Sequence, residues 1–152
     1  MNKLKAVIID DETAAVYNLA GMLEEHIQNV KVMAGTTQPE EGIGLINKHR
    51  PDIVFLDINM PGTDGFTLLK QVGHKNFKLV FTTAYAQYAI QAIRHKADDY
   101  LLKPVSPLEL RNCISTILYK ELPFPAVSGK KFPAIIELSV RMALSLFGSA
   151  IL

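Results

Sequence analysis

Five apolar runs alternate with five stretches in which apolar residues recur at helical spacing, and this alternation constrains the fold more than any other feature of the chain. A strand followed by a helix, repeated along the chain, is typical of an α/β fold whose mainly parallel sheet is covered on both faces. With 152 residues, 49% of them hydrophobic, the chain can form one such domain with a small appendage. The predicted strands are residues 5–10, 30–36, 52–58, 78–84 and 98–103.

The predicted helices are identified by their apolar faces. The fifth also has a start signal: Ser106 is the expected N-cap, Pro107 suits the first helical position, and Glu109 completes a capping box. The faces are Val16, Leu19, Leu23 and Ile27 in the first helix, Ile43 and Ile46 in the second, Phe66 and Leu69 in the third, Ala86, Ile90, Ile93 and Ala97 in the fourth, and Leu110, Ile114 and Ile117 in the fifth.

Charge and cysteine content narrow the possible functions. The net charge is +1 with acids and bases mixed throughout, so neither a nucleic-acid surface nor a membrane-binding face is expected. The single cysteine, Cys113, excludes an internal disulfide framework and fits a reducing cytosol, and we expect it to fill space in the core. Residues 1–5 run straight into a strand without a signal peptide, which favours a cytoplasmic location.

Polar residues stand at the carboxyl ends of the predicted strands, where ligands bind in open α/β sheets. Asp10 and Asp11 follow the first strand, and Asp57 ends the third, with a turn expected beyond it at Met60-Pro61-Gly62. Three carboxylates should therefore share one crevice. Like charges at that spacing need a counter-charge, and an oxygen-binding divalent cation, Mg²⁺, would supply it. Thr83 and Lys103 end the fourth and fifth strands.

Each of these residues alone has an ordinary structural interpretation, such as a solvated turn or a surface lysine. Together they share one chemical explanation, in which a carboxylate attacks a phosphoryl group and becomes an acyl phosphate. The metal and a lysine neutralise charge on the transferred group, while a hydroxyl and backbone N–H groups bind its remaining oxygens. Phosphoryl transfer needs mainly such positioning and charge stabilisation.

The chain therefore resembles a two-component response regulator receiver domain over about residues 3–120. The matching residues are Asp10-Asp11, Asp57 with Met60-Pro61-Gly62 behind it, Thr83-Ala84, and Tyr100-Leu101-Leu102-Lys103-Pro104. The resemblance implies a flavodoxin-like (βα)5 doubly wound sheet with strand order 2-1-3-4-5. It also implies a phosphorylated switch rather than an enzyme with a separate substrate, with autophosphorylation and autodephosphorylation as its only activities.

The family implies a role for each matching position. Asp57 would accept the phosphoryl group from a sensor histidine kinase, and Lys103 and Ala84 would contact that group. Thr83 would reach for it and draw Tyr100 inward, changing the face around the fourth helix, fifth strand and fifth helix and promoting a homodimer. The Lys103–Pro104 peptide would be cis. The implied Mg²⁺ ligands are Asp11, Asp57, the carbonyl of Asn59 and, largely through water, Asp10.

Residues 81–92 and 97–104 further resemble receivers that precede a LytTR-type DNA-binding domain. Residues 122–152 are too few for such a domain, so DNA binding would require an effector domain that is missing or truncated here. We expect a receiver domain over 1–121, followed by a linker and a short hydrophobic tail whose apolar residues alternate between 136 and 146. Glu137 and Arg141 make the tail a poor membrane span.

Other functions remain open at this level. A stand-alone receiver could act through protein partners. A haloacid dehalogenase-type phosphatase also forms an aspartyl phosphate, but needs Asp-x-Asp after the first strand, where this chain has Asp10-Asp11-Glu12. A flavin mononucleotide carrier would need a Ser/Thr/Gly-rich loop at the same place. A receiver-like interaction module that is never phosphorylated would not need the complete acidic set.

Overall fold

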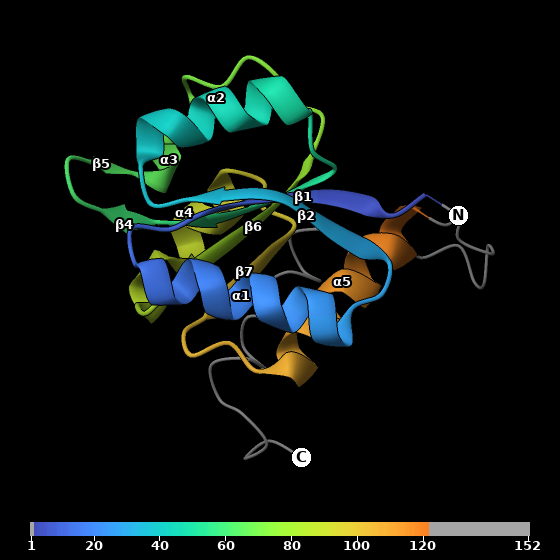
Figure 1. Ribbon diagram of the computed structural model, residues 1–152. Coiled ribbons are helices and arrows are strands. Elements are labelled where there is room, and N and C mark those ends of the chain that lie inside the picture. The colour runs from blue at the N-terminus through green and yellow to red at the C-terminus, as the bar shows by residue number, and fades with distance from the viewer. Residues whose placement is uncertain (1, 122–152) are drawn as a thin grey trace, which may run out of the picture.

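The computed structural model describes residues 2–121 and contains a five-stranded parallel sheet (Figure 1). Its order, β2-β1-β3-β6-β7, corresponds to 2-1-3-4-5 for the five long strands and confirms the predicted flavodoxin-like topology. The predicted tail, 122–152, lies outside the described residues. The strands are β1 (Leu4–Ile9), β2 (Val30–Thr36), β3 (Ile53–Asp57), β6 (Lys78–Thr83) and β7 (Asp99–Leu102).

Helices cover both faces of this sheet, because alternate residues of each central strand point to opposite sides. Figure 1 shows α1 (Thr13–His26) and α5 (Pro107–Glu121) on one side and α2 (Pro39–His49) on the other. In β1, Ala6 and Ile8 pack with α1 and α5, whereas Val7 and Ile9 pack with α2, α3 (Gly65–Leu69) and α4 (Ala89–Arg94). The sequence therefore forms two separate apolar cores, one on each face.

The predicted faces of α1, α2 and α5 are confirmed. Cys113 is fully buried in the core, as expected. The Ser106 hydroxyl accepts a hydrogen bond from the backbone N–H of Glu109 at 3.2 Å, so Ser106 caps α5 as predicted. Among the predicted face residues that lie within these helices, the buried ones are Leu19 and Leu23 in α1, Ile46 in α2, and Leu110, Ile114 and Ile117 in α5.

The predicted face of the fourth helix is only partly right: Ala97 is buried and Ile93 packs against the core, but Ala86 and Ile90 are exposed. The chain first forms a 3₁₀ turn, η1 (Ala86–Tyr88), and α4 begins only at Ala89. A 3₁₀ turn has three residues per turn rather than 3.6, so it changes which side chains face the sheet. Ile90 is 64% exposed, whereas Ala92 is fully buried. The helix ends at Arg94, before Ala97, and Lys96 adopts a left-handed φ of 57° between them.

A small hairpin follows Asp57 and was only partly predicted. The turn at Pro61-Gly62 is confirmed, and Gly62 has the positive φ of 81° that favours glycine. Its flanking strands, β4 (Asn59–Met60) and β5 (Thr63–Asp64), are antiparallel and too short to show an alternating pattern in the sequence. The hairpin returns the chain to Gly65, whose N–H donates to the carbonyl of Ile58 at 2.8 Å.

Candidate functional site

Four strands bring the predicted polar residues to one edge of the sheet. Asp10 follows β1, Asp57 ends β3, Thr83 ends β6 and Lys103 follows β7, and these strands are consecutive neighbours. Because all four are parallel, their carboxyl ends meet at the same edge, which confirms the predicted grouping. Asp10 and Asp57 are each only 3% exposed, so their carboxylates lie in a low-dielectric environment.

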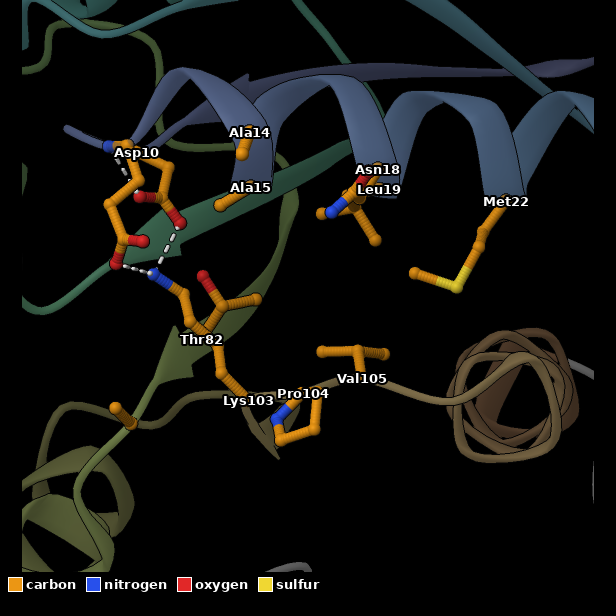
Figure 2. Close-up of a pocket in the computed structure, with 12 residues that line it drawn as sticks. Asp10, Ala14, Ala15, Asn18, Leu19, Met22, Thr82, Lys103, Pro104 and Val105 are labelled. Carbon is orange, nitrogen blue, oxygen red and sulfur yellow. Dashed lines mark hydrogen bonds and ion pairs between the residues drawn. The ribbon is translucent and has the colours of Figure 1, made fainter.

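Lys103 lies among three carboxylates. Its Nζ is 2.7 Å from Asp10 Oδ2, 3.4 Å from Asp57 Oδ2 and 3.4 Å from Glu12 Oε1. Figure 2 shows the Lys103 side chain extending from the β7 end of the sheet to Asp10. Burial alone would lower the pKa of Lys103, but the hydrogen bond to Asp10 and the charges of Asp57, Asp10 and Glu12 outweigh it and raise the pKa. The amine is therefore a permanent cation in the site.

One cation does not balance the acids around Asp57. Burial, then a hydrogen bond with Asp11 and the charge of Asp10, raise the pKa of Asp57 to about 8. Lys103 and the backbone N–H of Asn59, which donates to Asp57 Oδ1 at 3.3 Å, act in the opposite direction and do not cancel this rise. The site thus favours a second positive charge, which would allow Asp57 to ionise near neutral pH.

The carboxylates fit a hard divalent cation. Ligand oxygens of Asp10, Asp11 and Glu12 lie within 4.8 Å of one another, and Asp57 adjoins Asp11. Carboxylate oxygen is the ligand that Mg²⁺ prefers. Burial first, and then Asp11 and Asp10, disfavour the charged form of Asp57, and a bound cation would offset both effects. Glu12 belongs to this group but was not among the predicted ligands.

A separate set of hydrogen bonds holds the loop after β6. Thr83 Oγ accepts from the N–H of Tyr85 at 3.2 Å, and the Tyr100 hydroxyl donates to the carbonyl of Tyr85. Tyr100 is 2% exposed, and burial raises its pKa to about 12. Tyr100 therefore already lies inside the protein, whereas the resemblance implied that it moves inward on phosphorylation.

A cavity of about 380 Å³ opens beside the acidic cluster, between α1 and the start of the β7–α5 connection. Asp10 and Lys103 lie at one end, and Thr82 and Ala84 also line it. Thr82 was not predicted to belong to the site; it lies beside Thr83, and adjacent strand residues point to opposite faces. Figure 2 shows the apolar remainder of the lining, contributed by Ala14, Ala15, Leu19, Met22, Pro104 and Val105.

Two backbone features support this arrangement. The Lys103–Pro104 peptide is cis, as the resemblance implied. Gly65 packs so tightly that a Cβ built there would lie 2.7 Å from the backbone carbonyl oxygen of Asp57. Sequence reasoning missed Gly65, because the chain between it and Asp57 gave no indication that the hairpin folds back onto the strand end.

Comparisons with known proteins agree with this geometry. The family profile of the response regulator receiver domain matches residues 6–115. An uncharacterized response regulatory protein of Vibrio parahaemolyticus is 44% identical over 115 residues, covering 75% of this chain and 47% of that protein. Transcriptional regulatory protein BtsR of Escherichia coli is 36% identical over 116 residues, covering 75% of this chain and 48% of that protein. The chain thus spans about half the length of these curated relatives.

Solved structures show the same fold. The REC domain of AraT, a response regulator from Geobacillus stearothermophilus, superposes with a TM-score of 0.69 at 35% identity, covering 77% of this chain and 94% of that one. Within residues 2–121, no helix is both long and apolar enough to cross a membrane. The family match, the strand order and the carboxylate–lysine cluster together place this chain in the response regulator receiver domain family.

Proposed function

We propose that this receiver accepts a phosphoryl group from a sensor histidine kinase onto Asp57, in a reaction that requires Mg²⁺. The observation that carries the proposal is the position of Lys103, whose Nζ lies 3.4 Å from Asp57 Oδ2 and 2.7 Å from Asp10 Oδ2. A nucleophilic carboxylate, a fixed cation and adjacent acids that can hold a metal are the parts that phosphoryl transfer needs.

The chemistry assigns a task to each group. An oxygen of ionised Asp57 attacks phosphorus, the bond from phosphorus to the donor's histidine nitrogen breaks, and an acyl phosphate forms on Asp57. Lys103 turns from the carboxylates to the phosphoryl oxygens, and the backbone N–H of Ala84 donates to another. Asp11, Asp57 and the carbonyl of Asn59, with Asp10 acting through water, would hold Mg²⁺, which would supply positive charge to neutralise the negative charge of the reacting groups.

The cavity beside the acids suits the approach of a protein donor. It begins at Asp10 and Lys103 and continues along α1 past Asn18 to Met22, so a donor segment could contact the apolar wall while its histidine reaches Asp57. No histidine lies among the residues that line this cavity, which agrees with a donor histidine supplied by another protein.

The output is proposed to pass through Thr83 and the loop after β6. When the Thr83 hydroxyl turns to the phosphoryl group, it gives up the hydrogen bond that it accepts from the N–H of Tyr85, and the loop and α4 can shift. Ile90 on α4 and Tyr85 are 64% and 48% exposed, so this face offers apolar contacts to a second copy of the chain. Dimerisation would then control transcription through a LytTR-type effector domain in the intact regulator, and the name of the relative BtsR supports a transcriptional output.

Acetyl phosphate with Mg²⁺ tests the acceptor directly. The wild type should gain one phosphoryl group by intact-mass measurement, and Asp57→Asn should gain none, because an amide is not a nucleophile here. Asp64→Asn is the matched control: Asp64 is exposed and caps α3 through Thr67 N–H at 2.7 Å, and asparagine can keep that cap. Normal phosphorylation of Asp57→Asn would refute the acceptor assignment.

A further inference from the structure

Glu12 occupies the N-cap position of α1 without acting as a cap. Its backbone carbonyl accepts from Val16 N–H at 3.2 Å, but its side chain makes no capping hydrogen bond. The carboxylate instead turns back over the strand ends, where Oε1 lies 3.4 Å from Lys103 Nζ. Because the Glu12 side chain does not cap α1, the fold of that helix does not require its position beside Lys103.

Glu12 differs from the other two acids that contact Lys103. The side chains of Asp10 and Asp57 are each 4% exposed and fixed at strand ends, whereas that of Glu12 is 64% exposed. An exposed glutamate can rotate away at little cost, because exposed ion pairs contribute little to stability. Glu12 can therefore move away from Lys103 when the ammonium group of Lys103 binds the phosphoryl group.

We infer that Glu12 restrains phosphoryl transfer, by occupying Lys103 and by adding negative charge where an anionic donor enters. This inference rests on the proposed function of Asp57. Donor phosphoryl oxygens compete with Glu12 Oε1 for the same ammonium, and they must approach a site that already holds Asp10, Asp11 and Asp57. Neutralising Glu12 should therefore speed the reaction, most strongly for donors with the most negative charge.

The test compares Glu12→Gln with the wild type at saturating Mg²⁺, with saturation established by a separate metal titration of each protein. The amide keeps the shape of the side chain and removes its charge. Glu24→Gln, an exposed glutamate on the same helix, controls for the overall loss of one negative charge. We expect acetyl phosphate to phosphorylate Glu12→Gln about two- to ten-fold faster at low ionic strength, with the gain shrinking as salt rises. With phosphoramidate, a donor that carries less negative charge, the rate of Glu12→Gln should exceed that of the wild type by a smaller factor.

Binding of beryllofluoride with Mg²⁺ provides a second measurement that needs no transfer step, and Glu12→Gln should bind this anion more tightly than the wild type and Glu24→Gln.

An unchanged or slower rate in Glu12→Gln overturns the inference, and a slower rate would show that Glu12 positions Lys103 productively. The inference is also overturned if Glu12→Gln is phosphorylated faster than the wild type by the same factor with both donors and at every salt concentration. A wild type that is not phosphorylated refutes the proposed function itself, whereas a phosphorylated wild type with no faster Glu12→Gln refutes only the role of Glu12.

Discussion

The hydroxyl of Tyr100, on β7, donates a hydrogen bond to the backbone carbonyl of Tyr85, in the loop after β6. The N–H of the same Tyr85 donates to Thr83 Oγ at 3.2 Å. The backbone N–H and carbonyl of Tyr85 are therefore held by Thr83 and Tyr100, the two residues that the family resemblance assigns to the switch. Movement of either one changes the restraint on the loop that leads into α4.

Tyr100→Phe should loosen this loop while preserving the buried ring. We expect the free energy of unfolding to fall by about 1 kcal/mol and backbone amides of residues 84–89 to exchange hydrogen faster, because the Tyr85 carbonyl loses its side-chain donor. Tyr17→Phe is the control, since Tyr17 is 73% exposed. Unchanged amide protection in residues 84–89 of Tyr100→Phe would show that this hydrogen bond does not restrain the loop.

Asp57→Asn should stabilise the metal-free protein in a pH-dependent way. The folded-state pKa of about 8 lies above the ordinary value of 3.8, so between these values the folded state keeps a proton that the unfolded state has lost. Stability of the wild type should therefore fall as pH rises from about 4 to 8, and the variant lacks this loss. We expect Asp57→Asn to be more stable by at least about 2 kcal/mol at pH 8 and nearly equal at pH 4.

Denaturant unfolding in a chelating buffer measures this difference. Saturating Mg²⁺ should reduce or abolish the advantage of Asp57→Asn, since the ion favours the charged carboxylate of the wild type. If the difference in unfolding free energy between Asp57→Asn and the wild type is the same at pH 4 and pH 8, the Asp57 carboxylate is not the titrating group.

The polar residues at the strand ends could be predicted from the sequence, because the apolar run of each strand and the residue that ends it are both visible locally. Asp10, Asp57, Thr83 and Lys103 each end an apolar run, and parallel topology then brings them together. The face of α4 could not be predicted in the same way, because the 3₁₀ turn that precedes it shifts the helical phase and leaves Ile90 exposed. Glu12 enters the site through the orientation of its side chain, which residue spacing does not determine. Thr82 lines the cavity because it faces the side of β6 opposite to Thr83, a consequence of the strand alternation.

Gly65→Ala should displace the backbone that carries Asp57. The new Cβ would lie 2.7 Å from the carbonyl oxygen of Asp57, so the end of β3 or the hairpin must shift. We expect a loss of about 1–3 kcal/mol in stability and slower phosphorylation of Asp57. Gly44→Ala is the matched control, because its Cβ meets nothing within 4 Å and alanine favours the helix α2. Wild-type rates in Gly65→Ala would indicate that the backbone at Asp57 tolerates the displacement.

Ile90→Glu should weaken the proposed active dimer. Ile90 is 64% exposed on α4, so a charge there leaves the folded monomer intact but cannot be buried in an apolar contact without cost. Sedimentation in saturating beryllofluoride and Mg²⁺ should show a dimer for the wild type and a smaller dimer fraction for Ile90→Glu. Tyr17→Glu, at a 73% exposed position on α1, should dimerise normally. Equal dimer fractions in all three proteins would show that Ile90 on α4 is not part of the dimer interface.

A chain that ends at Glu121 should fold and accept phosphate like the full chain. Both faces of the sheet are already covered within the described residues, by α1 and α5 on one side and α2, α3 and α4 on the other. The apolar alternation between residues 136 and 146, which lie outside the described residues, predicts from the sequence a strand with one hydrophobic face, and a lone strand is not stable in water. We therefore expect the shortened chain to be more soluble and more monomeric in sedimentation, with unchanged phosphorylation at Asp57. Unfolding of the shortened chain would show that residues 122–152 complete the receiver core and that the predicted boundary at 121 is wrong.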